Sequence, residues 1–285
     1  MFKRIRIATL FLLLAGTAVE VSSASGPLND EQSKILESVR ITALRYTYRL
    51  PDFICTQITH RQASPQSGMN AGTGISANQT NLGLPGANRS GLGVTNDEIE
   101  ERLTYFGQKE SYEVIAVDGK RVSGVDHLQF QGAITVGEFG SALRDIFDPR
   151  SHTDFRWERK SSLHGHSVYI LKFRVPKEHG NIVIDRDQRK QIIVPYSGKL
   201  FVDTKSLEVL RLTSNLELPH DFPILSVEST VEYKPTGIAG KDYILPYRSE
   251  VRLKDMWDLY VNRIDFKNYQ KFTTESTIHY DGDAK

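Results

Sequence analysis

The chain has 285 residues, of which 39% are hydrophobic and 25% charged, with 36 Lys and Arg residues against 35 Asp and Glu residues. These values are typical of a globular protein with enough apolar material for a core. They exclude a wholly disordered chain, a collagen-like fibre and a membrane protein with several spans. The near-neutral balance argues against a nucleic-acid-binding protein, which normally carries an excess of basic residues. Because Cys55 is the only cysteine, no intramolecular disulfide can form.

The first residues have the layout of a secretory signal. Lys3 and Arg4 precede an apolar run, Ile7–Val19, and small residues up to Ala24 offer a cleavage site. The apolar run is shorter than the roughly 20 residues that cross a bilayer, although an uncleaved anchor is the competing interpretation. We therefore expect residues 1–24 to be removed and the chain to be exported to the periplasm or the extracellular space, with no membrane span left after cleavage.

An amphipathic helix is predicted next. Between Asp30 and Tyr46 apolar residues recur at steps of three and four, and charged residues cover the other side. Asn29 or Asp30 can cap the start of this helix, and Leu50-Pro51-Asp52 ends it. The apolar stripe, which we expect to pack on a sheet, consists of Ile35, Leu36, Val39, Ala43 and Tyr46.

A strand-like segment, Phe53–Thr59, follows the helix and contains the cysteine. We expect Cys55 to be a buried apolar residue. The alternative is a catalytic thiolate, which needs a nearby His or a helix N-terminus to lower the pKa of the thiol. His60 lies an odd number of residues further along the strand and therefore on its opposite face, so the two residues cannot form a local pair.

Residues 63–96 differ in kind, since they are rich in Gly, Asn, Ser and Ala and contain Arg89 as their one charged residue. Such a segment cannot bury enough apolar surface to offset the entropy of ordering it, so a disordered loop is predicted there. Residues 25–280 are predicted to form a single domain interrupted by this loop, and residues 281–285 to form a C-terminal tail.

From Asp97 onward the main signal is alternation with a period of two, and apolar and charged side chains on opposite faces indicate an antiparallel sheet covered on one side. Short turns such as Asp118-Gly119 and Leu163-His164-Gly165 favour a meander over crossover connections. A second helix is predicted over Thr135–Phe147, with a capping box between Thr135 and Glu138. Apolar residues expected to share a face are Leu210 with Leu212, Leu216 and Leu218, Val227 with Val231 and Tyr233, and Tyr247 with Val251 and Leu253.

The expected fold class is therefore α+β. A large curved antiparallel sheet of about ten strands carries the N-terminal helix and one further helix packed on it. No internal repeat is visible in the sequence.

Several short motifs resemble the lipoprotein-carrier superfamily, which comprises LolA-like and RseB-like domains. The segment from Gly198 to Arg211 is similar to a strand, Asp-turn, strand hairpin of that family, and Tyr243-Ile244-Leu245-Pro246 and residues 266–272 resemble its final strands. Secreted bacterial proteins with Leu50-Pro51-Asp52-Phe53 and Gly137-Glu138-Phe139-Gly140 are still more similar. The resemblance implies an unclosed β-barrel whose concave face holds acyl chains or a hydrophobic partner segment. It carries over no catalytic residue.

Candidate chemistry outside this resemblance is sparse. His164-Gly165-His166 is the most tempting metal pair, but it spans a probable turn and has no third ligand at a recognisable spacing, so no metal site and no cofactor is predicted. Asp185-Arg186-Asp187 and Asp281-Gly282-Asp283 lack the ligands of a calcium loop. Glu138 and Phe139 form either a tight entry into the second helix, which we favour, or a lid.

The sequence thus predicts an exported, non-catalytic carrier or binding protein for a lipid, an acyl chain or a lipoprotein. The alternatives are an envelope domain that binds other proteins and has a filled core, and an exported hydrolase with a dispersed carboxylate site. The sequence does not define the oligomeric state. The predicted ligand-lining residues are Tyr112, Val114, Tyr169, Leu171, Phe173, Leu210, Leu212, Val231, Tyr233, Val251, Ile264 and Phe266.

Overall fold

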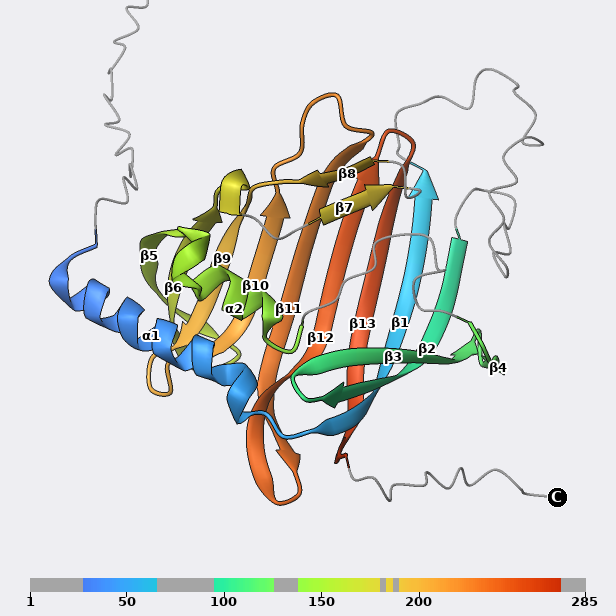
Figure 1. The fold of residues 1–285 in the computed structure, drawn as a ribbon, viewed down its shortest axis with the longest axis horizontal. Helices are drawn as coiled ribbons and strands as arrows, with labels where there is room; N and C mark the ends of the chain where they lie inside the picture. The colour runs from blue at the N-terminus through green and yellow to red at the C-terminus, as the bar shows by residue number, and fades with distance from the viewer. Residues whose placement is uncertain (1–27, 66–94, 126–137, 180–182, 187–189, 273–285) are drawn as a thin grey trace, which may run out of the picture.

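The computed structural model describes residues 28–65, 95–125, 138–179, 183–186 and 190–272 (Figure 1). The predicted signal segment 1–24 and the predicted tail 281–285 lie outside these residues. The helices are α1 (Asp30–Arg49) and α2 (Ser141–Phe147), with the 3-10 turns η2 (Pro149–Ser151) and η3 (Lys177–His179). The strands are β1 (Phe53–Pro65), β2 (Thr95–Phe106), β3 (Lys109–Val117), β4 (Lys120–Arg121), β5 (Asp154–Leu163), β6 (His166–Val175), β7 (Val183–Arg186), β8 (Lys190–Ile193), β9 (Tyr196–Asp203), β10 (Val209–Leu216), β11 (Ile224–Ile238), β12 (Lys241–Asp255) and β13 (Asp258–Lys271).

The described strands form one 11-stranded sheet and a separate two-stranded hairpin of β7 and β8. The sheet order is β4-β3-β2-β1-β13-β12-β11-β10-β9-β6-β5, and all of its pairs are antiparallel. Because β4 and β5 are edge strands that do not pair with each other, the sheet is open and not a closed barrel. The predicted antiparallel meander is confirmed. We call the face that α1 and α2 cover in Figure 1 the inner face, and the opposite one the outer face.

Helix α1 forms where the sequence predicts it and extends slightly further. Asn29 caps it in a capping box, in which the Asn29 side chain accepts from the Gln32 backbone N–H at 2.8 Å and the Gln32 side chain accepts from Asn29 N–H at 3.1 Å. All members of the predicted apolar stripe belong to the main core cluster or pack against it. Tyr46 also donates a hydrogen bond of 2.7 Å to the backbone oxygen of Ile244. Among the described residues, no helix has both the length and the apolar character needed to cross a membrane.

Helix α2 begins later than predicted. The expected start at Thr135 lies outside the described residues, and Glu138, Phe139 and Gly140 form a turn, so the predicted capping box involving Glu138 is wrong. The physical reason is Gly140, whose φ of 107° lies in a region that a right-handed helix cannot include. The turn directs the buried ring of Phe139 away from α2 and into a second core cluster.

Two β-bulges change the predicted faces of the late strands. The register between β9 and β10 shifts between Val209 and Arg211, so Leu210 packs with Val168 and Ile170 on the outer face, whereas Leu212 faces α1 and α2. A second shift, in the pairing of β11 with β12, places Tyr247 beside Glu232 on the outer face. The prediction that Leu210 and Tyr247 share a face with their alternate neighbours is therefore wrong, because an extra residue in one strand reverses the alternation there.

The strands on either side of the predicted loop are longer than expected. β1 continues through Pro65, because its last residues pair with both neighbours, Ala63 with Thr95 of β2 and Pro65 with Asp258 of β13. Residues 63–65 and 95–96, which the sequence assigned to the loop, thus belong to β1 and β2. Residues 66–94 lie outside the described part of the chain.

The predicted tight turns are confirmed by their backbone angles. Asp118 and Gly119 have φ values of 50° and 69°, and His164 and Gly165 have values of 48° and 85°. Positive φ at both central residues is the signature of the turn type that best matches the twist of a β-hairpin.

Gly198 in β9 is required by a close approach to the next strand. A Cβ atom at this position would meet the backbone oxygen of Thr213 at 1.8 Å. We expect Gly198→Ala to lower the free energy of unfolding by about 1–3 kcal/mol, because a backbone atom in a paired strand cannot move aside cheaply. Urea denaturation measures this loss. Gly237→Ala is the control, since its nearest atom would be Asp242 Oδ1 at 3.6 Å, and an equal loss in both variants would contradict the prediction.

Phe139 is fully buried, and its ring lies 5.2 Å from that of Phe53 and 5.4 Å from that of Phe266, centroid to centroid. We expect Phe139→Ala to lower the free energy of unfolding by about 3–5 kcal/mol, because the cavity cannot refill with the surrounding rings. Phe106→Ala, at an exposed ring, should cost much less. Thermal or urea unfolding of both variants distinguishes a core residue from a surface one, and equal midpoints would refute this role for Phe139.

Candidate functional site

Part of the inner face is packed against the helices (Figure 1). Val39 of α1 and Leu143 and Phe147 of α2 form one cluster with side chains of β6, β9, β10 and β11. The predicted ligand-lining residues that belong to this cluster are Tyr169, Leu171, Phe173, Leu212, Val231 and Tyr233. These side chains therefore belong to the same packed core as the two helices.

A second cluster fills the inner face near the start of β1. Phe139 lies among Phe53, Tyr105, Phe266 and Tyr269, with all ring centroids within 6.3 Å of its own. Of the other predicted lining residues, Ile264 belongs to this cluster and Tyr112 packs against it. Glu138 is also buried, and the Tyr233 hydroxyl donates to its backbone oxygen at 3.2 Å. This arrangement agrees with the tight helix entry favoured from the sequence.

The remaining predicted lining residues are separate from these clusters. Val114 and Val251 are buried at 3% and 1% exposure. Leu210 lies on the outer face, as described above. The role of the predicted residues in ligand binding stays a prediction.

Sheet register arranges the inner-face side chains of β10 to β2 in rows across the strands. One row, which we call the polar row, runs Ser214, Ser229, Val251, Asn262, Arg61 and Asp97. The hydroxyls of Ser214 and Ser229 lie 2.7 Å apart and form a hydrogen bond. Arg61 Nε donates to Asp97 Oδ1 at 2.7 Å, and a second contact makes this ion pair bidentate. The polar row is therefore a strip of mostly polar side chains across the inner face, with side-chain hydrogen bonds at both of its ends.

The row on the helix side of the polar row is mostly apolar and contains two buried hydroxyl residues, Ser249 and Thr59. It runs Leu212, Val231, Ser249, Ile264, Thr59 and Ile99. Ser249 is 1% exposed, and its hydroxyl has no hydrogen-bond partner among the described residues. A buried hydroxyl without a partner costs about 1–3 kcal/mol, so this position favours contact with an added polar group.

The row on the other side of the polar row is apolar and remains partly exposed. We call it the apolar rim, and it consists of Val227, Leu253, Tyr260 and Ala63. These side chains belong to none of the core clusters formed by the described residues. The rim lies at the end of the sheet where β12 turns into β13, uppermost in Figure 1. Apolar groups of the inner face are thus partly accessible at this end of the sheet.

Further exposed apolar side chains lie near the apolar rim, at the start of β11 and on the β12–β13 turn. Leu225, Met256 and Trp257 are 50%, 52% and 59% exposed. The buried carboxylate of Asp255 accepts the backbone N–H groups of Trp257 and Asp258, each at 2.8 Å. These two bonds fix the turn, so Met256 and Trp257 are held at the surface by a defined backbone conformation.

The cysteine is not placed for catalysis. Cys55 is buried in the second cluster, and burial raises the pKa of its thiol well above the usual range. His60 faces the outer side, with Nδ1 at 3.2 Å from Glu98 Oε2. Both the predicted burial of Cys55 and the predicted separation of the two residues are confirmed.

The two histidines of His164-Gly165-His166 have different partners. His164 Nε2 lies 3.4 Å from Glu232 Oε1, and His166 Nδ1 lies 3.2 Å from Asp203 Oδ2. Within the described ranges, no group of three or more His, Cys, Asp or Glu side chains is arranged to hold a metal ion. Asp185 lies in β7, whereas Asp187, Asp281 and Asp283 lie outside the described residues.

Glu232 is the centre of a hydrogen-bonded group on the outer face. The Tyr247 hydroxyl donates to Glu232 Oε2 at 2.6 Å, and Arg211 Nε donates to Oε1 at 2.7 Å. Burial acts to raise the pKa of Glu232, but the hydrogen bonds from Tyr247 and Arg211 outweigh it, so the pKa is lowered. These hydrogen bonds join β10, β11 and β12, so the group has a structural role.

Comparison with known proteins gives matches among solved structures. No family model and no curated protein matches the chain. A LolA superfamily protein from Nitrosomonas europaea is 12% identical, with a TM-score of 0.39 and coverage of 83% of this chain and 93% of that one. A DUF1329 family protein from Desulfovibrio piger is 11% identical, with a TM-score of 0.37 and coverage of 84% and 94%. An outer membrane lipoprotein-sorting protein domain from Vibrio parahaemolyticus is 10% identical, with a TM-score of 0.37 and coverage of 86% and 93%.

The Glu232 group predicts a defined response to acid. The pKa of Glu232 is lower in the folded state than in the unfolded state, where it is about 4.3. The charged carboxylate therefore stabilises the fold above the unfolded-state pKa, and this stabilisation is lost as the pH falls through the folded-state pKa. We expect Glu232→Gln to cost about 1 kcal/mol at neutral pH and progressively less below about pH 4, since a neutral amide replaces a charged acceptor.

Urea unfolding of the Glu232 variant at several pH values checks this dependence. Glu228→Gln, at an exposed position on the same strand, is the control. A pH-independent difference between Glu232→Gln and the unmodified chain would contradict the proposed contribution of the charged carboxylate.

Proposed function

We propose that this chain is an exported, non-catalytic binding protein for a hydrophobic ligand such as a lipid, an acyl chain or the acylated part of a lipoprotein. The ligand's apolar part lies on the apolar rim and on the adjoining inner face of β11, β12, β13 and β1. The observation that carries this proposal is the apolar rim itself, where Val227, Leu253 and Tyr260 remain partly exposed on the inner face.

The chemistry of the neighbouring rows supports an amphipathic ligand. Burial of apolar surface is worth about 25 cal/mol per Å², so an acyl chain gains affinity by covering the rim. The polar row lies directly beside the rim, and Asn262 and the serine hydroxyls provide hydrogen-bonding groups there. A ligand group that reached one row deeper would give the hydroxyl of Ser249 a partner. A hydrophobic ligand with a carbonyl or hydroxyl group fits this arrangement, with its apolar part on the apolar rim and its polar group on the polar row.

The non-catalytic part of the proposal is supported by the state of the reactive groups. The thiol of Cys55 is buried and its pKa is raised, which opposes thiolate formation. Arg61 and Asp97, the charged residues of the polar row, form an ion pair with each other. Export follows from the layout of residues 1–24 and would place the chain in the periplasm or outside the cell.

A second candidate function is the binding of another protein, in which case the core of this chain is filled by its own side chains. It is favoured by the burial of the predicted lining residues, since Leu171 and Val251 are each 1% exposed. In this case the exposed Leu225, Met256 and Trp257 would contact the partner directly. A cross-linking pull-down that yields one defined protein and no lipid would favour this candidate.

The experiment for the carrier proposal begins with the protein purified from its own host. Native mass spectrometry should reveal a co-purifying lipid, and the delipidated protein should bind a fluorescent fatty acid. Absence of both would refute the proposal. The same protein is then used for the variant test.

We expect Leu253→Ser to weaken fatty-acid binding by about 10-fold or more, because the contact surface of a Leu side chain is worth about 1.5–3 kcal/mol when fully buried. Arg252→Ser is the matched control, since Arg252 directly precedes Leu253 in β12 and its side chain is 45% exposed on the outer face. Fluorescence titration measures both affinities, and equal binding by the two variants would exclude the apolar rim as the ligand site.

A further inference from the structure

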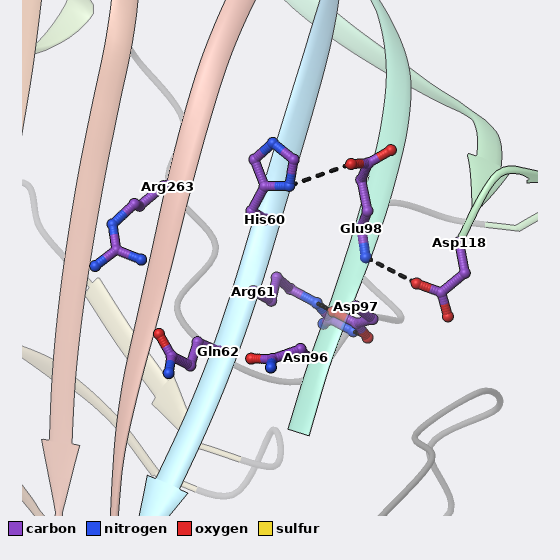
Figure 2. A pocket seen from close by; sticks show the side chains of 8 residues that line it. All are labelled: His60, Arg61, Gln62, Asn96, Asp97, Glu98, Asp118 and Arg263. Atoms are coloured by element: carbon purple, nitrogen blue, oxygen red, sulfur yellow. Dashed lines mark hydrogen bonds and ion pairs between the residues drawn. The ribbon is translucent and has the colours of Figure 1, made fainter. Parts of the chain in front are cut away.

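A polar pocket of about 370 Å³ lies on the outer face of β13, β1 and β2. Figure 2 shows His60 and Gln62 of β1, Asn96 and Glu98 of β2, Arg263 of β13 and Asp118 of the turn after β3 around it. Arg61 and Asp97 also belong to its lining, although the alternation along β1 and β2 directs their side chains to the inner face. Its volume falls within the range of about 300–1,000 Å³ that is usual for small-molecule sites. Because His60 and Gln62 alternate with Thr59 and Arg61, this pocket and the polar row lie on opposite faces of the same strand.

The register places the pocket residues in two adjacent rows. The first row runs Arg263, His60 and Glu98, and the second places Gln62 directly opposite Asn96. The first row therefore offers a guanidinium, an imidazole and a carboxylate, and the second offers two amides. Each amide carries both a hydrogen-bond donor and an acceptor. The pocket thus presents donors and acceptors side by side over a short distance.

The charged groups of the pocket are engaged within the protein. His60 Nδ1 lies 3.2 Å from Glu98 Oε2, and Arg263 Nε lies 3.1 Å from Glu250 Oε2. The carboxylate of Asp118 accepts the backbone N–H of Glu98 at 3.0 Å. A charged ligand would have to compete with these opposite charges already in place. A neutral ligand can instead use the remaining donor and acceptor positions without separating any pair.

We propose that this pocket binds an uncharged, polyhydroxylated ligand of the size of a mono- or disaccharide. Each hydroxyl of such a ligand both donates and accepts, which matches the amides of Gln62 and Asn96 flanked by the carboxylates of Glu98 and Asp118. The planar groups of Arg263 and the two amides can contact neighbouring hydroxyls in pairs. The site is independent of the apolar rim, so the protein would hold a sugar on one face of the sheet and an apolar group on the other.

The test uses the full chain and a panel of probes in titration calorimetry and NMR. Glucose, N-acetylglucosamine and maltose are the neutral probes, and glutamate, spermidine and inorganic phosphate are the charged ones. We expect at least one neutral sugar to bind, with an affinity that does not change between low and high NaCl, because no ionic contact is formed. Failure of every neutral sugar to bind, or binding of charged probes alone with strong salt dependence, would overturn the proposal.

Variants locate the binding site. Gln62→Ala and Asn96→Ala should each weaken sugar binding by about five-fold, as expected for the loss of one neutral hydrogen bond. Asn215→Ala is the matched control, since it removes an exposed amide from β10, outside the pocket. Undiminished sugar binding by the Gln62→Ala/Asn96→Ala double variant would place the sugar elsewhere and reject this site. The fluorescent fatty acid is titrated in parallel and should bind the double variant normally, so failure of the sugar site and failure of the carrier proposal are distinguishable.

Discussion

The width of the sheet relative to the helices that cover it is the constraint on which the rest of the structure depends. At a spacing of about 4.8 Å, an 11-stranded sheet is roughly 48 Å wide, whereas α1, whose 20 residues run across the strands in Figure 1, is about 30 Å long. α1 and α2 accordingly pack over only part of the inner face, where Val39, Leu143 and Phe147 meet β6, β9 and β10. The composition of the other rows follows from this division, because side chains that are not opposed by a helix can be polar, as in the polar row, or partly exposed, as in the apolar rim.

Much of the fold could be predicted from the sequence because its main signals are local. The stripe from Ile35 to Tyr46 determines α1 and its buried face, and alternating residues predict the antiparallel strands. The bulges at Leu210 and Tyr247 could not be predicted, since one extra residue reverses the faces without any change in local composition. The late start of α2 depends on the conformation of Gly140, which the sequence allows but does not require.

The candidate site was less accessible to sequence reasoning than the fold. Apolar residues were recognised individually, but the polar row exists only through the register that brings Ser229, Asn262 and Arg61 into one line. The apolar rim could have been found from Val227 and Leu253, which alternate correctly, although their partial exposure depends on where the helices end. The outer pocket required pairing between strands far apart in the chain, and no spacing rule joins His60 to Arg263. Adjacent residues of β1 therefore contribute to two chemically different surfaces.

The position of β1 has a consequence for how the molecule assembles. This strand follows α1 near the start of the domain, yet it lies between β2 and β13, and its residue Phe53 pairs with Lys271 in the last described strand. Pairing of β1 with β13 closes a very large loop, and the entropy lost in closing it opposes the pairing until the contacts have formed. This pairing is therefore a slow, late event in folding. A nascent chain lacking its final strand would therefore leave β1 and β12 as two unpaired edges in the middle of the sheet. Completion of the sheet thus waits for β13, because this strand alone supplies the partner that both β1 and β12 lack.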